Sequence, residues 1–353
     1  MALGASTVVD LFFFHQRGRA MGIFTVAMTN GAHISPIIGG LIGQYCGWRW
    51  IFKFAAILDG FMLLTIIFFL PETLYVRESL TPANMGPSAT RLNKEQYINR
   101  LRLWTSHPSL KLQGSHFVIP TLKMMKYPSV IFPALYLSSQ YGFASILPAV
   151  TVAHIFTKYF GWSTMDIGIA YGAALTIGGS LGELAAGIVV DGIVKRERRK
   201  LGGRDPEPEV RLKAIWTGEI LEPIGLLIYG FTLQYRMHWM GPLFGMGLAS
   251  FGVQIILTTC YTYSVDCYRD RNSDVSQVFN FWRQEVGMTF AFYVIDWAEV
   301  IGYQFVFLFF AIVGSVLAFI PILVLMWKGK EIRERLGSPG QAISAVVDGA
   351  EKK

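Results

Sequence analysis

Charged residues are scarce in this chain of 353 residues. Asp, Glu, Lys and Arg make up 16% of it, below the about 25% of a typical soluble domain. The residues AVILMFWYC make up 52%. So few charges among so many apolar residues exclude an ordinary soluble domain and indicate a protein that spans a membrane.

Cysteine is also rare. Cys46, Cys260 and Cys267 lie in or beside apolar segments, and no CxxC or Cys/His ligand spacing accompanies them. This arrangement argues against a disulfide framework or a zinc site, so we interpret the three cysteines as packing residues. The sequence also has no HExxH helix, no Asn-x-Ser/Thr acceptor, and no Gly-Lys-Ser/Thr after its glycine-rich stretches. We therefore expect no metal, no cofactor and no enzymatic activity.

Eight apolar runs are each long enough to cross a hydrocarbon core of about 30 Å, which takes about 20 helical residues. They lie near 20–45, 49–70, 128–156, 162–190, 213–234, 239–265, 274–297 and 300–327. Residues 1–13 are apolar but too short. A signal peptide does not fit them, because they lack a basic n-region and Asp10 interrupts the run. The sequence predicts an all-α polytopic membrane protein with about eight complete transmembrane helices and an N-terminal stub.

The net charge of +7 is concentrated in alternate connecting segments. Five such segments hold 26 of the 31 Lys and Arg residues: 14–19, 71–127, 191–213, 266–273 and 328–353. The turns on the other side hold only Lys158 and Arg236. Because Lys and Arg are enriched in cytoplasmic loops, the five basic segments are predicted to be cytoplasmic, the C-terminal tail included. The lipid bilayer, and no nucleic acid, is the expected partner of these charges.

The stretch from Asp10 to Gly40 combines a short basic turn with an apolar helix that carries glycines and an internal proline. Small residues let neighbouring membrane helices approach closely, and a packed neighbour can satisfy the carbonyl that a proline frees. Ordinary tight packing in any membrane bundle would explain this composition about equally well.

The same stretch resembles the fifth transmembrane helix of antiporters in the major facilitator superfamily. That helix carries the pattern GPxxGPxxGG, which follows an Asp and an RGxAxG turn. The match here consists of four residues: Gly31, Pro36, Gly39 and Gly40. Ala32 and Ser35 stand where the family has Pro and Gly. The resemblance implies the antiporter branch.

The residues after the second full span also resemble this family. Leu70 to Leu74 read LPETL, similar to the start of the long cytoplasmic loop in fungal drug transporters. The resemblance divides the chain into a remnant of an N-terminal helical bundle (1–70), a cytoplasmic central loop (71–127), a six-helix C-terminal bundle (128–327) and a cytoplasmic tail (328–353). Relative to the family, the first three helices and most of the fourth would be missing. Two explanations for the missing helices stay open: a truncated product, or a gene model that starts at an internal methionine.

A second cytoplasmic signature follows the span near 162–190. Asp191, Lys195 and Arg196 resemble the GxxxD(R/K)xGR(R/K) loop of the family, with extra residues between the acid and the basic pair. In the family this loop holds the two halves together through charge pairs when the cytoplasmic side is closed. The alternative is a simple stop-transfer cluster of charges.

An ionisable residue inside a span costs about 2.5 to 3.5 kcal/mol on insertion scales, so each one marks a possible site. In the segment 273–290, a helical period places Asn280, Arg283 and Gln284 on one polar stripe. A water-filled cavity would explain such a stripe. Alternatively, Arg283 pairs statically with an acid, and Glu285, which lies off the stripe, is one possible partner.

Three further residues are candidates for binding solute. His33 lies in the middle of the antiporter-like helix and could bind substrate or exchange protons, although a packing histidine is an equal alternative. Gln140 and Tyr141 lie in the first helix after the loop, which lines the cavity in the family; packing is again the alternative. Asp59 and the pair Glu219 and Glu222 belong to helices that flank the bundle in the family, and we give them less weight.

The resemblance as a whole implies a fungal drug:proton antiporter of the polyamine or multidrug type. Such a carrier exports small organic solutes against inward proton flow by alternating access. We expect a multi-pass protein, monomeric and in the plasma membrane, that transports poorly or not at all if its first bundle is incomplete. A non-transporting membrane fragment or interaction protein is the main alternative. An integral membrane enzyme is less well supported, because no cluster of catalytic residues is apparent.

Overall fold

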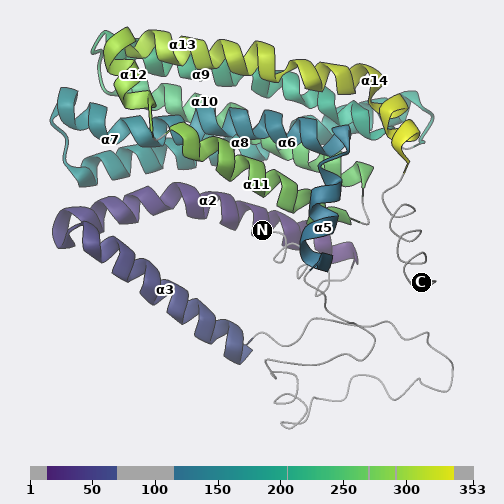
Figure 1. The fold of residues 1–353 in the computed structure, drawn as a ribbon, viewed down its shortest axis with the longest axis horizontal. Coiled ribbons are helices and arrows are strands. Elements are labelled where there is room, and N and C mark those ends of the chain that lie inside the picture. The colour runs from purple at the N-terminus through teal and green to yellow at the C-terminus, as the bar shows by residue number, and fades with distance from the viewer. Residues whose placement is uncertain (1–13, 70–114, 205, 269–270, 291, 338–353) are drawn as a thin grey trace.

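The computed structural model describes residues 14–69, 115–204, 206–268, 271–290 and 292–337, and these residues form helices without any strand (Figure 1). The helices are α2 (Phe14–Cys46), α3 (Trp48–Phe69), α5 (Ser115–Met124), α6 (Pro128–Tyr141), η2 (Gly142–Ile146), α7 (Leu147–Phe160), α8 (Thr164–Lys200), η3 (Pro208–Ala214), α9 (Ile215–Gln234), α10 (Met240–Cys267), α11 (Asn272–Phe290), α12 (Val294–Ile301), α13 (Tyr303–Ile312), η5 (Val313–Ala318) and α14 (Ile320–Leu336). The predicted all-α class is confirmed.

Each predicted span corresponds to helical structure, but four of them differ in extent or continuity. The first span after the loop is continuous from α6 through η2 to α7, and the last is continuous from α13 through η5 to α14. The predicted span 274–297 consists instead of two helices, because α11 ends at Phe290 and α12 begins at Val294. Helix α8 continues to Lys200, where its exposed basic last turn lies beyond the apolar part. Apolar length alone does not show where a helix breaks or continues into charged sequence.

Among the described residues, five helical segments are long and apolar enough to cross a membrane. They are Trp48–Phe68, Pro128–Phe160, Thr164–Lys200, Met240–Cys267 and Tyr303–Leu336. Most of the predicted central loop lies outside the described residues. Its last part is not a loop, since residues Ser115–Met124 form α5.

Helices α6 to α14 pack together, and we call them the C-terminal bundle. One apolar core joins α7, α9 and α13 through residues such as Leu147, Tyr229 and Phe307. A second core lies toward the other end of α6 and α10 and includes Tyr136, Ile256 and Tyr263. The long helices run side by side in Figure 1, and the two cores follow one another along α10.

Glycines set the closest helix contacts in this bundle. A Cβ atom added to Gly218 of α9 would lie 2.6 Å from the carbonyl oxygen of Gly252 in α10. One added to Gly225 would lie 2.7 Å from the carbonyl oxygen of Gly245. Such backbone proximity is typical of membrane helices that associate through small residues.

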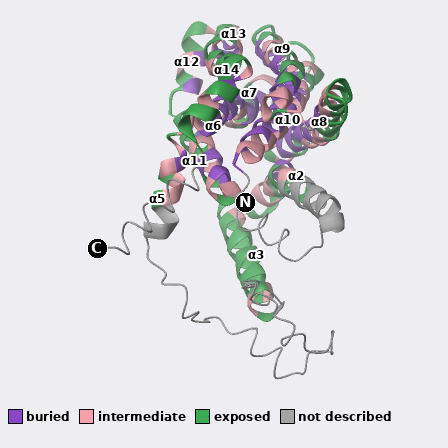
Figure 2. Cartoon of the chain, turned by 90° about the vertical axis from the view of Figure 1, so that its right-hand side faces the viewer, coloured by how far each residue is buried: buried purple, intermediate pink, exposed green. Residues whose placement is uncertain are grey.

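Helix α2 also packs along α8 through glycines, and we call this contact the α2–α8 seam. A Cβ on Gly40 would lie 2.9 Å from the carbonyl oxygen of Thr164. A Cβ on Gly168 would meet the backbone of Pro36 and Gly40. The seam therefore joins the N-terminal helices to the C-terminal bundle. Helix α3 turns away from the bundle, and Figure 2 shows it almost entirely exposed.

Candidate functional site

The polar stripe of α11 lies at the edge of the face by which this helix packs on the bundle. Val278 and Phe279 are buried, Asn280 and Arg283 are half-buried, and Gln284 is exposed. The stripe therefore runs from the packed side of α11 to its open side. Helical periodicity predicted which residues share the stripe. Which of them the bundle buries depends on how α11 is rotated about its axis.

Arg283 reaches from α11 to α6. Its guanidinium carbon lies 4.8 Å from the ring centroid of Tyr141, which is a cation–π distance. The Nε atom of Arg283 is buried and has no hydrogen-bond acceptor among the described residues. No described acid pairs with Arg283, and Glu285 is exposed on the same helix. Two of the predicted binding residues thus contact each other.

Tyr141 is held at a break in helical geometry. It is the last residue of α6, and the π-helical turn η2 follows it directly. The ring of Phe290 from α11 covers Gly142, where any side chain would collide with it. Single π-helical turns inside membrane helices occur frequently at functional sites, because they change which way the following residues face.

Gln140, the neighbour of Tyr141, points to a different partner. Its Nε2 atom donates a hydrogen bond of 3.0 Å to Oε2 of Glu219 in α9, and the hydroxyl of Tyr136 donates to the same oxygen. Glu222, one turn further along α9, is 1% exposed. The structure therefore brings Gln140 to the acid pair to which the sequence analysis gave little weight. The sequence did carry a signal for this site, because Glu219 and Glu222 lie three residues apart in an apolar run.

His33 lies in the α2–α8 seam and not beside Arg283. The residue is 5% exposed, its ring lies against Gly179 of α8, and Ser250 of α10 lies nearby. Its Nδ1 atom is buried without a hydrogen-bond partner among the described residues. His33 thus lies where the first helices meet the C-terminal bundle, and its role in binding stays a prediction.

The four residues of the antiporter-like pattern divide between two environments. Pro36 and Gly40 lie in the seam against Gly168. Gly31 and Gly39 have open space where a Cβ would be. The close helix approach expected of this pattern is therefore present at Pro36 and Gly40 and not at Gly31 or Gly39.

Comparison with known proteins places this arrangement of helices in a family. The family model described as Major Facilitator Superfamily matches residues 1–292. The chain belongs to the major facilitator superfamily. Residues 1–292 are most of the sequence, and they include the α2–α8 seam and all the residues described so far in this section.

Curated members of the superfamily from fungi are similar to this chain. An uncharacterized transporter of Schizosaccharomyces pombe is 29% identical over 94% of this chain and 67% of its own length. The efflux pump radE of Floropilus chiversii is 28% identical over 86% of this chain and 55% of its own length. The MFS transporter fsa7 of a Fusarium species is 32% identical over 76% of this chain and 51% of its own length. The chain thus spans about half to two thirds of these relatives.

The residues predicted to form the cytoplasmic gate of this major facilitator protein lie on one exposed length of α8. Asp191, Lys195 and Arg196 are exposed, and none of them forms an ion pair with another described residue. The neighbouring Glu197 does, with Lys200 at 2.9 Å and Lys213 at 3.2 Å. The gating role stays a prediction.

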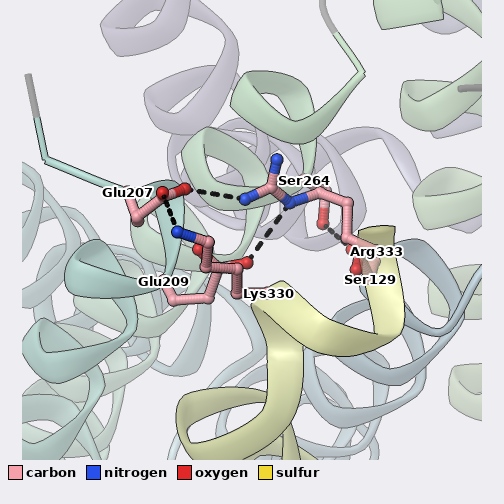
Figure 3. A network of polar contacts seen from close by, with 6 residues as sticks. All are labelled: Ser129, Glu207, Glu209, Ser264, Lys330 and Arg333. Atoms are coloured by element: carbon pink, nitrogen blue, oxygen red, sulfur yellow. Dashed lines mark hydrogen bonds and ion pairs between the residues drawn. The ribbon is translucent and has the colours of Figure 1, made fainter. Parts of the chain in front are cut away.

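A second charge network connects α14 with the segment that precedes α9 (Figure 3). It was not predicted from the sequence. Lys330 donates a hydrogen bond of 2.7 Å to Glu207, and Arg333 contacts Glu207 at 2.9 Å and Glu209 at 3.4 Å. The hydrogen bond from Lys330, more than that from Arg333, lowers the pKa of Glu207. The sequence shows acids before α9 and bases in the last turns of α14. Nothing in the sequence shows that these acids and bases meet.

Within the part of the chain that the structure describes, no group of three or more His, Cys, Asp or Glu side chains could hold a metal ion. The arrangement instead offers a guanidinium stacked on an aromatic ring and, next to it in sequence, an amide bound to a buried carboxyl. These groups can bind a polar or aromatic solute and exchange a proton.

Proposed function

We propose that this chain carries small organic solutes across a membrane, exporting them in exchange for protons by alternating access. Membership of the major facilitator superfamily and the fungal efflux relatives support this function. We propose the plasma membrane as its location, as the resemblance to fungal drug transporters implies. We place the C-terminal tail in the cytoplasm because the basic segments alternate along the chain and include that tail.

The observation that carries the proposal is the contact between Arg283 and Tyr141. A guanidinium at membrane depth is costly and is retained where it serves a pathway for solutes or ions. Arg283 has no described acid partner, so charge pairing does not explain its presence. An aromatic ring and a cation that meet from two helices can bind a drug-like solute by stacking and by hydrogen bonds.

Transport by purified residues 1–353 in proteoliposomes tests this proposal. Vesicles with an acidic interior are expected to accumulate rhodamine 6G or labelled spermidine, and dissipating the pH difference is expected to stop accumulation. A folded, reconstituted chain that moves neither probe would contradict the proposal and support the alternative of a non-transporting membrane fragment.

Variants of Arg283 connect transport to the site. Arg283→Gln is expected to lower the transport rate at least tenfold, because it removes both the charge and the stacking. Arg283→Lys keeps the charge but lacks the planar group, so an intermediate rate is expected. Glu285→Gln is the matched control on an exposed position of the same helix. Equal rates for all three variants would show that Arg283 has no role in binding.

A further inference from the structure

Two carboxyl groups lie one turn apart inside the C-terminal bundle. Glu219 and Glu222 are 6% and 1% exposed, and both lie in α9. Residues three apart lie on the same helix face, with Cβ atoms about 5 to 6 Å from each other. Two buried acids in one apolar helix multiply the cost of burying a charge, so the pair requires an explanation other than packing.

The two carboxyl groups differ in their hydrogen bonds. Oε2 of Glu219 accepts hydrogen bonds from Tyr136 and Gln140, both of α6. Oε1 of Glu219 and both oxygens of Glu222 are buried and accept none from the described residues. The site thus supplies donors for one carboxylate and none for the other.

No cation among the described residues compensates the pair. The groups that face it from the helices packed around α9 are Tyr136 and Gln140 of α6, Cys260 of α10 and Ser315 of η5. The basic residues of η3, just before α9, are already paired: Arg211 with Asp266 at 2.7 Å and Lys213 with Glu197 at 3.2 Å. At the far end of α9, the backbone oxygen of Tyr303 in α13 lies near Gly230.

Two buried acids without a counter-ion are expected to bind a proton. A second carboxylate without donors beside the first would be an unpaired buried charge, which is strongly unfavourable. A proton on one carboxyl removes that charge, and two interacting carboxyls bind their protons in separate steps. We propose that Glu219 and Glu222 form a proton-binding site, with Glu222 taking up and releasing the proton while Tyr136 and Gln140 hold Glu219.

This inference rests on the proposed function and assigns its coupling proton to α9. The geometry also supplies a connection to the solute. Gln140 contacts Glu219, and the next residue, Tyr141, contacts Arg283. A change of charge at the acid pair acts on Gln140 directly, so it can shift Tyr141 at the start of the π-helical turn η2.

Infrared difference spectroscopy tests proton binding without any transport. The purified chain in lipid is titrated with pH, and the carbonyl stretching band of protonated carboxyl groups is followed. Glu222→Gln is expected to remove a titrating band, and Tyr136→Phe is expected to shift it. Glu183→Gln, which changes a half-buried acid of α8 hydrogen-bonded to Thr258, is the matched control and is expected to leave that band unchanged. A band that survives in both Glu219→Gln and Glu222→Gln would overturn the proposal.

Transport of rhodamine 6G then tests coupling. Glu222→Gln is expected to lose accumulation driven by the pH difference at least tenfold, while exchange of labelled for unlabelled dye without a pH difference continues. Accumulation equal to that of the unmodified chain would overturn the assignment. If the unmodified chain moves no probe, the proposed function fails, and the infrared titration still decides whether the pair binds a proton.

Discussion

Helix α3 and helix α10 are both apolar enough to cross a membrane, but their surroundings are opposite. Of the most apolar stretch of α10, 67% is buried inside the protein, whereas none of that of α3 is. Phe61 of α3 is 65% exposed, while Ile256 of α10 is fully buried. Figure 2 shows the contrast as an exposed α3 beside a bundle with a buried interior.

What separates the two helices is the placement of small residues and not their hydrophobicity. Gly245 and Gly252 of α10 meet the backbone of α9, whereas Gly60 of α3 has open space around it. Lipid tails are as apolar as leucine, so apolar surface alone does not drive two membrane helices together. Close packing at small residues does, and leucine substitutions at two packed and two open glycines test this explanation.

The largest effect is expected from Gly225→Leu in α9. A side chain there collides with the backbone of Gly245 and Ala249, which cannot move without separating α9 from α10. We expect the chain to lose about 3 kcal/mol of stability or to fail to fold, since overpacking typically costs 1 to 3 kcal/mol and more where backbone is struck. Thermal unfolding in detergent measures this loss.

Gly60→Leu in α3 is the matched control. Because nothing lies within 4 Å of its Cβ position, we expect a change within about 0.5 kcal/mol. If the two leucine variants unfold at the same temperature, glycine packing does not distinguish α10 from α3.

An intermediate effect is expected from Gly168→Leu in the α2–α8 seam. The new side chain would meet the backbone of Pro36 and Gly40, and relief comes when α2 moves away from α8. We expect a cost of about 1 to 3 kcal/mol, confined to the seam. Spin labels at the exposed positions Ile34 and Ile177 would report the separation as a longer, broader distance distribution.

Gly187→Leu, at an open position of the same helix α8, controls for the effect of leucine itself. An unchanged distance distribution in Gly168→Leu would show that α2 is held to the bundle by contacts other than the glycine seam.

The sequence predicted helices well because membrane helices are set by apolar length, which a single chain displays directly. It did not predict the break between Phe290 and Val294, because an apolar run that spans two helices looks like one. Nor did it predict α5, whose apolar content is interrupted by Pro120 and Lys123. Tertiary packing decides such short elements, and it is not visible in local composition.

The candidate site was predicted residue by residue but not as contacts. Arg283, Tyr141 and Gln140 were each identified as polar groups in apolar helices. That Arg283 meets Tyr141 while Gln140 meets Glu219 depends on the rotation of α6 against its neighbours. Glu219 was given little weight because its helix flanks the bundle in the family, although its side chain faces inward.

The smallest effect is expected from the charge network of Glu207, Lys330 and Arg333 at the end of α14. These contacts join the same bundle, but Glu207 is half exposed, so solvent screens them. The pKa of Glu207 is lowered by Lys330 and Arg333 in the folded chain. Its contribution to stability is therefore complete above the ordinary pKa of a glutamate and is lost as the pH falls through the lowered value.

Acidification through that window is expected to cost at most about 1 kcal/mol, measured as a small fall in the unfolding temperature. Glu207→Gln removes the titrating group, so this part of the pH dependence should disappear while the rest of the curve is kept. Glu331→Gln is the matched control, because Glu331 forms its ion pair with Arg335 within the same helix and joins no second element. If Glu207→Gln and the unmodified chain show the same pH dependence, the contact of Glu207 with α14 contributes nothing to stability. The stability of this region would then come from the glycine-packed helices alone.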